Sequence, residues 1–326
     1  MKFVSAARLY FAIVIASAAP LVQGASAPAD ANYPTKPIRL IVPFSPGGTN
    51  DILARMIATH LTDVLGKTRI VDNRAGAEGI IGTEIVVKAA PDGYTLIVLS
   101  AAYVMNPAVR KLPYDPLTAL DFIAKLGSSA TVLCAGPSLP VSSLKEMLAV
   151  AKSKPGQITL GTSGGFQHFA TALFRSLSGQ DFNIVLYKGA FPAMMDVIGG
   201  QLHTTIVPIV PSLPHLRAGR LKALGTGAIK RSVLLPDLPT LDELGMSGYD
   251  ASNTYTFATT AGTPPAVVKR LYTLVANYMQ LPETQKRLTA MGAEIDLKSP
   301  EEVRKLVPIE IAKWTKVAIE AGMPRE

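Results

Sequence analysis

Apolar runs that fit β-strands alternate with segments of helical period along most of the chain. The run IRLIVPF at residues 38–44 predicts a strand, and apolar residues at helical spacing from Ile52 to Leu65 predict a helix that begins near Asp51. Further strands are predicted at 68–73, 94–100, 130–136, 157–163, 182–187, 203–210, 221–227 and 255–260, with helices between most of them. This alternation indicates βαβ units, so we expect an α/β fold with largely parallel sheets.

Helix start signals mark several of the expected helices. Ser143-x-x-Glu146 predicts a capping box before a helix at 144–153, and Ser299-Pro300-Glu301-Glu302 predicts the start of the last helix. Thr263-Pro264-Pro265 places proline at the first position of another helix. Residues 106–122, which contain several prolines, predict irregular structure.

The order of these elements predicts two lobes. The segment 131–247 alternates strands and helices on its own, whereas the helices after residue 264 have no strands of their own and must pack on earlier ones. We therefore expect lobe 2 at 131–247, inserted into a lobe 1 made of 33–130 plus 248–326. Two chain crossings would join the lobes and leave a cleft between them.

Residues 1–24 have the pattern of a cleavable signal peptide. Lys2 and Arg8 form a basic start, an apolar stretch follows, and small residues at Gly24 and Ala25 offer a cleavage site. An uncleaved membrane anchor is the alternative, but the apolar run is short for a span of about 20 residues and contains Pro20. The sequence therefore predicts export to the periplasm.

The composition favours a folded protein that binds a small molecule. Hydrophobic residues make up 48% of the chain and charged residues 17%, which permits sizeable cores. The formal charge of +8 falls to +6 without Lys2 and Arg8, and the basic residues are scattered, so no nucleic-acid arm is indicated. Cys134 is the only cysteine, which excludes an internal disulfide and predicts a buried strand thiol.

Sequence motifs of known chemistry are mostly incomplete in this chain. LTDVLGKT at 61–68 has Leu61 where a P-loop needs its first glycine, and GAEGIIG at 76–82 does not have the dinucleotide-binding spacing. The four histidines do not cluster in sequence, so neither a metal nor another cofactor is indicated. GTSGG at 161–165 does match Gly-x-Ser-x-Gly and precedes Asp196 and His203 or His215, so a serine hydrolase that uses Ser163 is an alternative.

The stretch PFSPGGTND at 43–51 predicts a site for an anion. A strand end, two glycines and a helix N-terminus together expose unpaired backbone N–H groups and the positive end of the helix dipole. Such a place accepts a carboxylate or phosphate without needing arginine or lysine. TLGTSGGFQH at 159–168 repeats the arrangement, and Gly189–Ala190 gives a third junction, as a clamp for a small anion would require.

Several long segments resemble one family of receptors. They are YPTKPIRLIVPFSPGGTNDILARMIATHL, VDNRAGAEGIIGTEIVVKAAPDGYTL, LPYDP, YKGAFPAMMDVIGGQ and GTPPAVVKRLYTLVANYMQLPETQKRLTAMGAE. In this order they are similar to the Bug-type periplasmic solute receptors of tripartite tricarboxylate transporters, from Tyr33 to about Gly322. The resemblance implies a two-lobed periplasmic-binding-protein type II fold that closes around a small carboxylate. It implies no enzymatic activity and no cofactor, membrane transporter subunits as partners, and a monomer.

Matching positions in the family then supply the expected ligand site. The first-lobe loop and the end of the third strand contribute one side of the cleft, and the second-lobe loops contribute the other. The resemblance implies a site made of Phe44, Ser45, Pro46, Gly47, Gly48, Thr49, Asp51, Ser100, Ala101, Thr162, Ser163, Gly164, Gly165, His168, Lys188, Gly189, Ala190 and Pro208. Within it we expect Asp51 to cap the helix N-terminus, and His168 and Lys188 to have structural or supporting roles.

The chain departs from the family pattern in three places, and these departures bear on the ligand. The second-lobe loop reads GTSGGFQH and carries Phe166, an acidic group is missing near Pro208, and SNTYTF at 252–257 replaces a tryptophan-containing motif. We interpret them as changes in ligand choice that favour an uncharged or purely acidic ligand over an amino acid. A receptor that reports to a membrane sensor instead of a transporter is an alternative.

Overall fold

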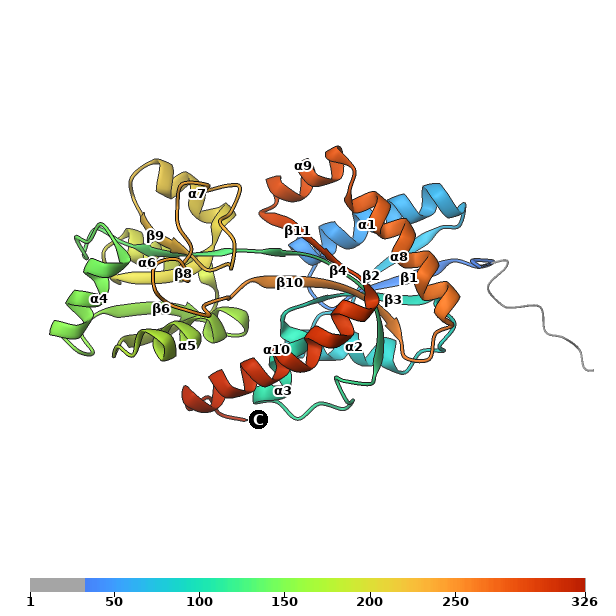
Figure 1. The fold of residues 1–326 in the computed structure, drawn as a ribbon, viewed down its shortest axis with the longest axis horizontal. Helices are drawn as coiled ribbons and strands as arrows, with labels where there is room; N and C mark the ends of the chain where they lie inside the picture. Colours follow the sequence, from blue (N-terminus) through green and yellow to red (C-terminus); the bar gives the residue numbers. More distant parts are fainter. Residues whose placement is uncertain (1–32, 326) are drawn as a thin grey trace, which may run out of the picture. The chain divides into compact units, whose positions relative to one another are not determined.

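The computed structural model describes residues 33–325, and the residues from Pro34 onward form one compact unit. The predicted signal peptide at 1–24 lies outside the described residues. Within the compact unit the strands form two sheets, which are called here sheet A and sheet B (Figure 1).

Sheet A has six strands in the order β11-β4-β10-β3-β1-β2. The pairs of β1 with β2 and with β3 are parallel, whereas β10 runs antiparallel to both β3 and β4. Its strands are β1 Ile38–Val42, β2 Arg69–Asn73, β3 Thr95–Ser100, β4 Leu120–Ser129, β10 Asn253–Thr260 and β11 Ala293–Lys298. The associated helices are α1 Thr49–Leu65, η1 Ala77–Gly79, α2 Ile80–Val87, α3 Ala102–Val109, α8 Pro265–Met279, α9 Pro282–Ala290 and α10 Pro300–Glu320.

Sheet B has five strands in the order β7-β6-β8-β5-β9. Strand β6 pairs parallel with β7 and β8, and β5 pairs antiparallel with β8 and β9. The strands are β5 Thr131–Ala135, β6 Thr159–Ser163, β7 Asn183–Tyr187, β8 Thr204–Pro208 and β9 Lys222–Thr226. The helices are α4 Leu144–Ser153, α5 Phe166–Ser178, α6 Ala190–Ile198 and α7 Ile209–Arg217.

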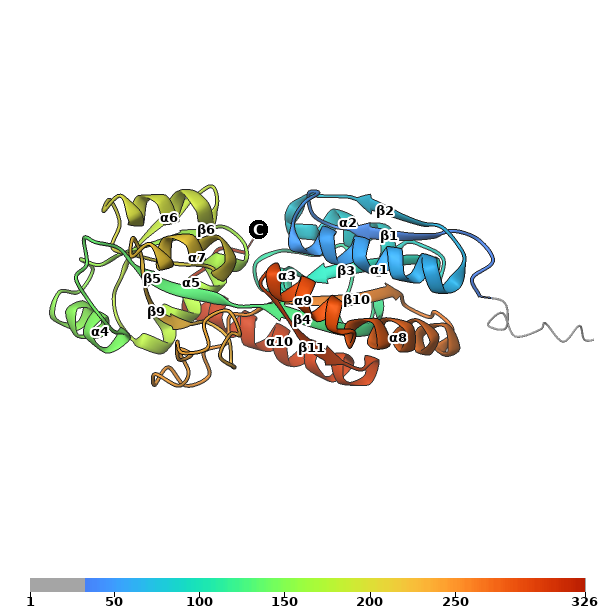
Figure 2. The same cartoon turned by 90° about the horizontal axis from the view of Figure 1, so that it is seen from above.

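The chain crosses between the sheets twice, and the crossings correct the expectation of largely parallel sheets. Strands β4 and β5 are separated only by Ala130, so one nearly continuous strand belongs to both sheets (Figure 2). The return strand β10 pairs with β4 from the register Asn253↔Ser129 onward. Because β5 and β10 each enter a sheet directly from the other one, without a crossover helix, they run against their neighbours.

The last helix also links the two halves. Trp314 of α10 is 1% exposed and stacks edge to face on Phe169 of α5, with ring centroids 5.7 Å apart. Burial of an aromatic side chain of this size is one of the larger single contributions to packing. Helix α10 therefore joins the sheet A elements to the core under sheet B.

Two expected elements differ from the observed ones. Residues 106–122 are not entirely irregular, because α3 extends to Val109 and includes Pro107; its Tyr103 and Met105 are buried, and this tertiary packing outweighs the proline. The expected strand at 203–210 ends at Pro208, and Ile209 already begins α7. A proline in the first turn of a helix loses no intrahelical hydrogen bond, which is why Pro211 does not prevent α7.

The capping signals gave accurate helix starts. Ser299 and Glu302 form the complete capping box before α10. Ser143 accepts a hydrogen bond from the Glu146 N–H before α4, while the Glu146 carboxylate returns to the N–H of Ser142, one residue further out than expected. Asp51 does not cap α1, because the N-cap is Gly48 and the helix begins at Thr49.

Candidate functional site

A cavity of about 250 Å³ lies where the two strand crossings meet helices from both halves. We call it the site cavity. Strands β4, β5 and β10 contribute its floor, and the first residues of three helices contribute its walls. Its lining consists of Thr49, Ser129, Ala130, Thr131, Phe166, Gln167, Pro208, Ile209, Val210, Pro211, Asn253, Tyr255, Met291 and Gly292.

Three helix N-termini meet at the site cavity. Thr49, Phe166 and Ile209 are the first residues of α1, α5 and α7, and none of these helices has a side-chain hydrogen bond at its N-cap. The first turns of α1 and α5 therefore have backbone N–H groups without a side-chain partner, whereas in α7 the Ile209 N–H donates to the Ala130 carbonyl oxygen and Pro211 has no N–H. Each N-terminus carries a partial positive charge of about half a unit. Among the described residues that line the cavity, none is charged, so the backbone supplies its positive potential.

Tyr255 provides the main side-chain hydroxyl at the floor. It is 2% exposed, and its hydroxyl lies 2.8 Å from the Ser129 Oγ. Burial raises the pKa of Tyr255, and hydrogen bonds with Ser129, Thr49 and Asn253 offset this only in part. The phenol therefore stays protonated at neutral pH and can donate a hydrogen bond to a ligand oxygen.

Asp51 stabilises the loop between β1 and α1 from outside the site cavity. Its carboxylate is buried and accepts hydrogen bonds from the Gly47 N–H at 3.0 Å, from the Arg55 Nε at 3.0 Å and from the Asn73 Nδ2 at 2.9 Å. Burial alone would raise the pKa of Asp51, but these three hydrogen bonds outweigh it and lower the pKa below its ordinary value. Asp51 thus orders the loop at Gly47 and does not line the cavity.

The loop between β6 and α5 consists of Gly164 and Gly165. Thr162 and Ser163 are buried at the end of β6; the Thr162 Oγ1 accepts a hydrogen bond from Thr171 at 2.9 Å. The Ser163 hydroxyl lies 3.5 Å from the Gln167 Oε1, which connects the loop to the cavity wall. His168 is half-buried, and burial together with the charge of Arg175 lowers its pKa.

The remaining expected site residues occupy several positions around these loops. Thr49 and Pro208 line the site cavity, whereas the other sixteen do not. Ser45 to Gly48 are exposed at the first loop, Lys188 is exposed beyond β7, and Ala101 donates its N–H to the Asn253 Oδ1 at 3.2 Å. Gly47 and Gly165 have positive φ values of 86° and 66°, which a side chain would strain.

The hydrogen bonds of the described residues do not assemble a hydrolase triad. His203 accepts a hydrogen bond at its Nδ1 from the Thr159 N–H at 3.0 Å, at the start of β6, whereas Ser163 lies at the other end of that strand. A strand of this length separates its ends by roughly 13 Å. Asp196 accepts its hydrogen bond from Tyr187, and the Nδ1 of His215 is buried without a partner.

The part of the chain that the structure describes contains neither a group of metal-ligating side chains nor a helix that could span a membrane. No three His, Cys, Asp or Glu side chains there are grouped so that they could hold a metal ion. No described helix is both long and apolar enough to cross a membrane.

Sequence reasoning missed most of the side chains that line the cavity. Ser129, Gln167, Asn253 and Tyr255 are not among the expected site residues, although the segment SNTYTF, which contains Asn253 and Tyr255, departs from the family pattern. Asn253 and Tyr255 are two residues apart on β10, so a strand places them on the same face. This period-two spacing, in a strand next to a chain crossing, is the sequence signal that could have identified Asn253 and Tyr255 as lining residues.

Comparisons with known proteins agree with one another. A family model described as tripartite tricarboxylate transporter family receptor matches residues 53–323. Protein BugT of Bordetella pertussis is 35% identical over 305 residues, which cover 92% of this chain and 94% of BugT. The solved structure of R. palustris Rpa4515 with adipate is 34% identical, covers 90% of this chain and 100% of its own, and has a TM-score of 0.75. MatC (Rpa3494) from Rhodopseudomonas palustris with bound malate is 29% identical, covers 87% and 99%, and has a TM-score of 0.70.

Proposed function

Because the chain belongs to the tripartite tricarboxylate transporter receptor family, we propose that it captures a small organic carboxylate in the site cavity and delivers it to the membrane subunits of such a transporter. It does so as an exported periplasmic receptor that performs no chemistry on the ligand. The lobe boundaries in this proposal follow the two sheets, with 131–247 as lobe 2 and the rest of the mature chain as lobe 1.

The chain shares its family and its fold with known receptors. The resemblance to Bug-type receptors is confirmed by the family match and by BugT, and the fold is the two-lobed α/β fold of periplasmic solute-binding proteins. Two structurally similar proteins hold dicarboxylates, adipate in one and malate in the other. These relatives support a carboxylate as the ligand class for this chain.

One observation carries the proposal: three uncapped helices begin at a single cavity whose lining has no charged side chain. An anion in this cavity would meet several helix N-termini at once, each contributing about 0.3–1 kcal/mol or more when partly buried. A cationic or amino group would find no carboxylate among the lining residues. The uncharged polar groups at Thr49, Tyr255 and Asn253 would then set the orientation of the ligand.

A thermal-shift titration with adipate, malate and their uncharged diamides tests the ligand class. Ligand at 100 times its Kd stabilises the folded protein by about 2.7 kcal/mol, which is measurable as a rise in Tm. We expect the acids to raise the Tm and the diamides to have no effect. Stabilisation by the diamides but not by the acids would refute an anion site.

Two variants of Thr49 locate the binding to this cavity. Thr49→Val has nearly the same shape but lacks the hydroxyl at the start of α1, whereas Thr49→Ser keeps it. We expect the acid-induced Tm shift to fall in Thr49→Val and to persist in Thr49→Ser. Uptake of the identified acid in cells with and without this receptor then tests delivery to a transporter, since unchanged uptake would contradict that role.

A further inference from the structure

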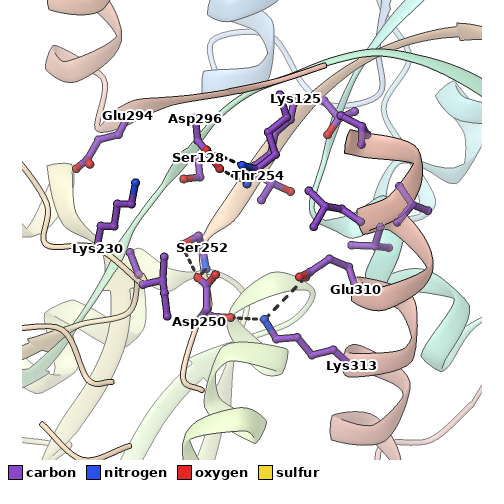
Figure 3. A pocket seen from close by; sticks show the side chains of 18 of the residues that line it. Lys125, Ser128, Lys230, Asp250, Ser252, Thr254, Glu294, Asp296, Glu310 and Lys313 are labelled. Carbon is purple, nitrogen blue, oxygen red and sulfur yellow. Dashed lines mark hydrogen bonds and ion pairs between the residues drawn. The ribbon is translucent and has the colours of Figure 1, made fainter. Parts of the chain in front are cut away.

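A second cavity, of about 370 Å³, lies behind the crossing strands, and we call it the rear cavity (Figure 3). Its wall includes Lys230 from the segment after β9, the strands β4, β10 and β11, and one side of α10. A volume above 300 Å³ is within the range of small-molecule sites.

The rear cavity is separate from the site cavity because the two lie on opposite faces of the same strand. Asn253 and Tyr255 of β10 line the site cavity, whereas Thr254 and Thr256 line the rear cavity. Successive side chains of a strand point to opposite faces, so β10 forms a wall between the two spaces. Nothing in the proposed receptor function requires the rear cavity.

Each acidic side chain of the rear cavity already has hydrogen-bond donors. Asp296 pairs with Lys125 and Lys298, which keep its pKa below the ordinary value although burial alone would raise it. The Asp250 carboxylate accepts from Ser252 at 2.6 Å. Glu310 accepts from the indole N–H of Trp314 at 3.1 Å.

Glu294 completes this set. Its carboxylate accepts hydrogen bonds from the Ser232 hydroxyl at 2.5 Å and from the Val233 N–H at 3.2 Å. A cationic ligand would therefore compete with hydrogen bonds and ion pairs that are already formed at every acid in the cavity.

In contrast, Lys230 has no hydrogen bond or ion pair with any described residue, although it lines the rear cavity beside the acids. In Figure 3 its amino group points into the space between the side chains of Glu294 and Ser128. The hydroxyl groups of Ser128 and Thr254, on neighbouring strands, also have no described partner. One ammonium and two hydroxyls are thus available to a ligand anion.

On the α10 side, the rear cavity has an apolar part next to Glu310 and Lys313. Val303 and Val307 of α10 are 3% and 6% exposed, and Trp314 lies on the same helix. The lining carries four acids and four lysines, and Lys230 is the lysine without a described partner, so a second negative charge on the ligand would have no ammonium to pair with. The lining therefore suits one anionic head and one hydrocarbon end.

We propose that the rear cavity binds a small monocarboxylate with an aliphatic tail, its carboxylate on Lys230, Ser128 and Thr254 and its tail against Val303 and Val307. This ligand site is distinct from the receptor site, and a dicarboxylate fits it less well than a monocarboxylate. Charge-assisted hydrogen bonds from an ammonium are among the stronger polar contacts, so Lys230 contributes most of the affinity.

Isothermal titration with hexanoate tests the rear site directly. We expect binding to the unmodified protein, at least tenfold weaker binding to Lys230→Gln and to Thr254→Val, and unchanged binding to Lys286→Gln, an exposed lysine outside both cavities. Both Lys230 and Lys286 are exposed, so the paired substitutions alter the same charge with little risk to folding.

The variant Gln167→Glu separates this proposal from the receptor function, because Gln167 lines only the site cavity. We expect hexanoate to bind Gln167→Glu as it binds the unmodified protein. Loss of hexanoate binding in Gln167→Glu would place it in the site cavity and overturn the rear site. Equal affinity of Lys230→Gln and Lys286→Gln for hexanoate, or no binding to any form, would also overturn it.

Discussion

The substitution Gln167→Glu separates the effect of a negative charge at the site cavity on stability from its effect on ligand binding. Gln167 is the second residue of α5 and lines the cavity. Glutamate has nearly the same shape and can still accept a hydrogen bond from the Ser163 hydroxyl, which now lies 3.5 Å from the Gln167 Oε1. The change therefore adds one negative charge and little else.

The charge acts in opposite directions on stability and on binding. In the free protein, a carboxylate in the first turn of α5 interacts favourably with the helix dipole, which stabilises the fold by about 0.3–1 kcal/mol. In the complex, a cavity of about 250 Å³ brings the new carboxylate to within about 6 Å of a bound anion. Coulomb's law with an effective dielectric constant of about 20–40 gives a repulsion of roughly 1–3 kcal/mol at that distance.

We therefore expect Gln167→Glu to leave the Tm unchanged or slightly raised and to weaken carboxylate binding roughly 10- to 100-fold. Isothermal titration with the acid found in the screen measures the affinity, and thermal denaturation without ligand measures the stability. Gln157→Glu is the matched control, because Gln157 is exposed just before the start of β6, at the opposite end of that strand. Equal affinities of the two variants would refute an anion site at α5.

Three further substitutions test other parts of the site. Tyr255→Phe removes the hydroxyl that lies 2.8 Å from Ser129; we expect calorimetry to show about tenfold weaker binding and urea denaturation to show a loss of about 0.5–1.5 kcal/mol. Asp51→Asn should lower the free energy of unfolding by about 1–3 kcal/mol at pH 7. Because folding lowers the pKa of Asp51, the ionised carboxylate stabilises the fold above its ordinary pKa of 3.8, and this stabilisation disappears as the pH falls through the pKa of the folded protein. A difference in the free energy of unfolding between Asp51→Asn and the unmodified protein that persists at pH 2 would contradict this role. Gly48→Val should keep the Tm within a few degrees, since a Cβ there meets only the Ser45 carbonyl oxygen at 3.9 Å. If the ligand approaches this loop, calorimetry should show at least tenfold weaker binding to Gly48→Val. An unchanged affinity would exclude that approach.

The sequence was informative where local chemistry decides the structure. Ser299 and Glu302 formed their capping box as expected, and the glycines at 47–48 and 164–165 do lie between strands and helices. These features depend on residues that are close together in the chain. The same local pattern identified two of the three helix N-termini that meet at the site cavity.

The third N-terminus was missed because its signal contradicts helix formation. The apolar run that predicts a strand at 203–210 continues through Ile209 and Val210, which are the first two residues of α7, and Pro211 and Pro214 are not typical of a helix. Strand β11 was missed although its residues alternate between apolar and charged, because it is short and half of it consists of Glu294, Asp296 and Lys298, which are uncommon in strands. These charges face the rear cavity and its ion pairs, so their burial depends on tertiary contacts that no local pattern records.

The uncharged lining of the site cavity leads to a last prediction about pH. Among the described residues that line it, Tyr255 is the only titratable one, and burial raises the pKa of Tyr255 above the ordinary value of 10.0. His168, next to the lining residue Gln167, has a lowered pKa and is already neutral at pH 7. A dicarboxylate is fully ionised in the same range, so neither partner changes its charge between pH 7 and pH 9. Calorimetry should therefore give an affinity that is constant within about threefold across this range. A tenfold fall from pH 7 to pH 9 would mean that a titrating cation, and not the helix N-termini, binds the acid.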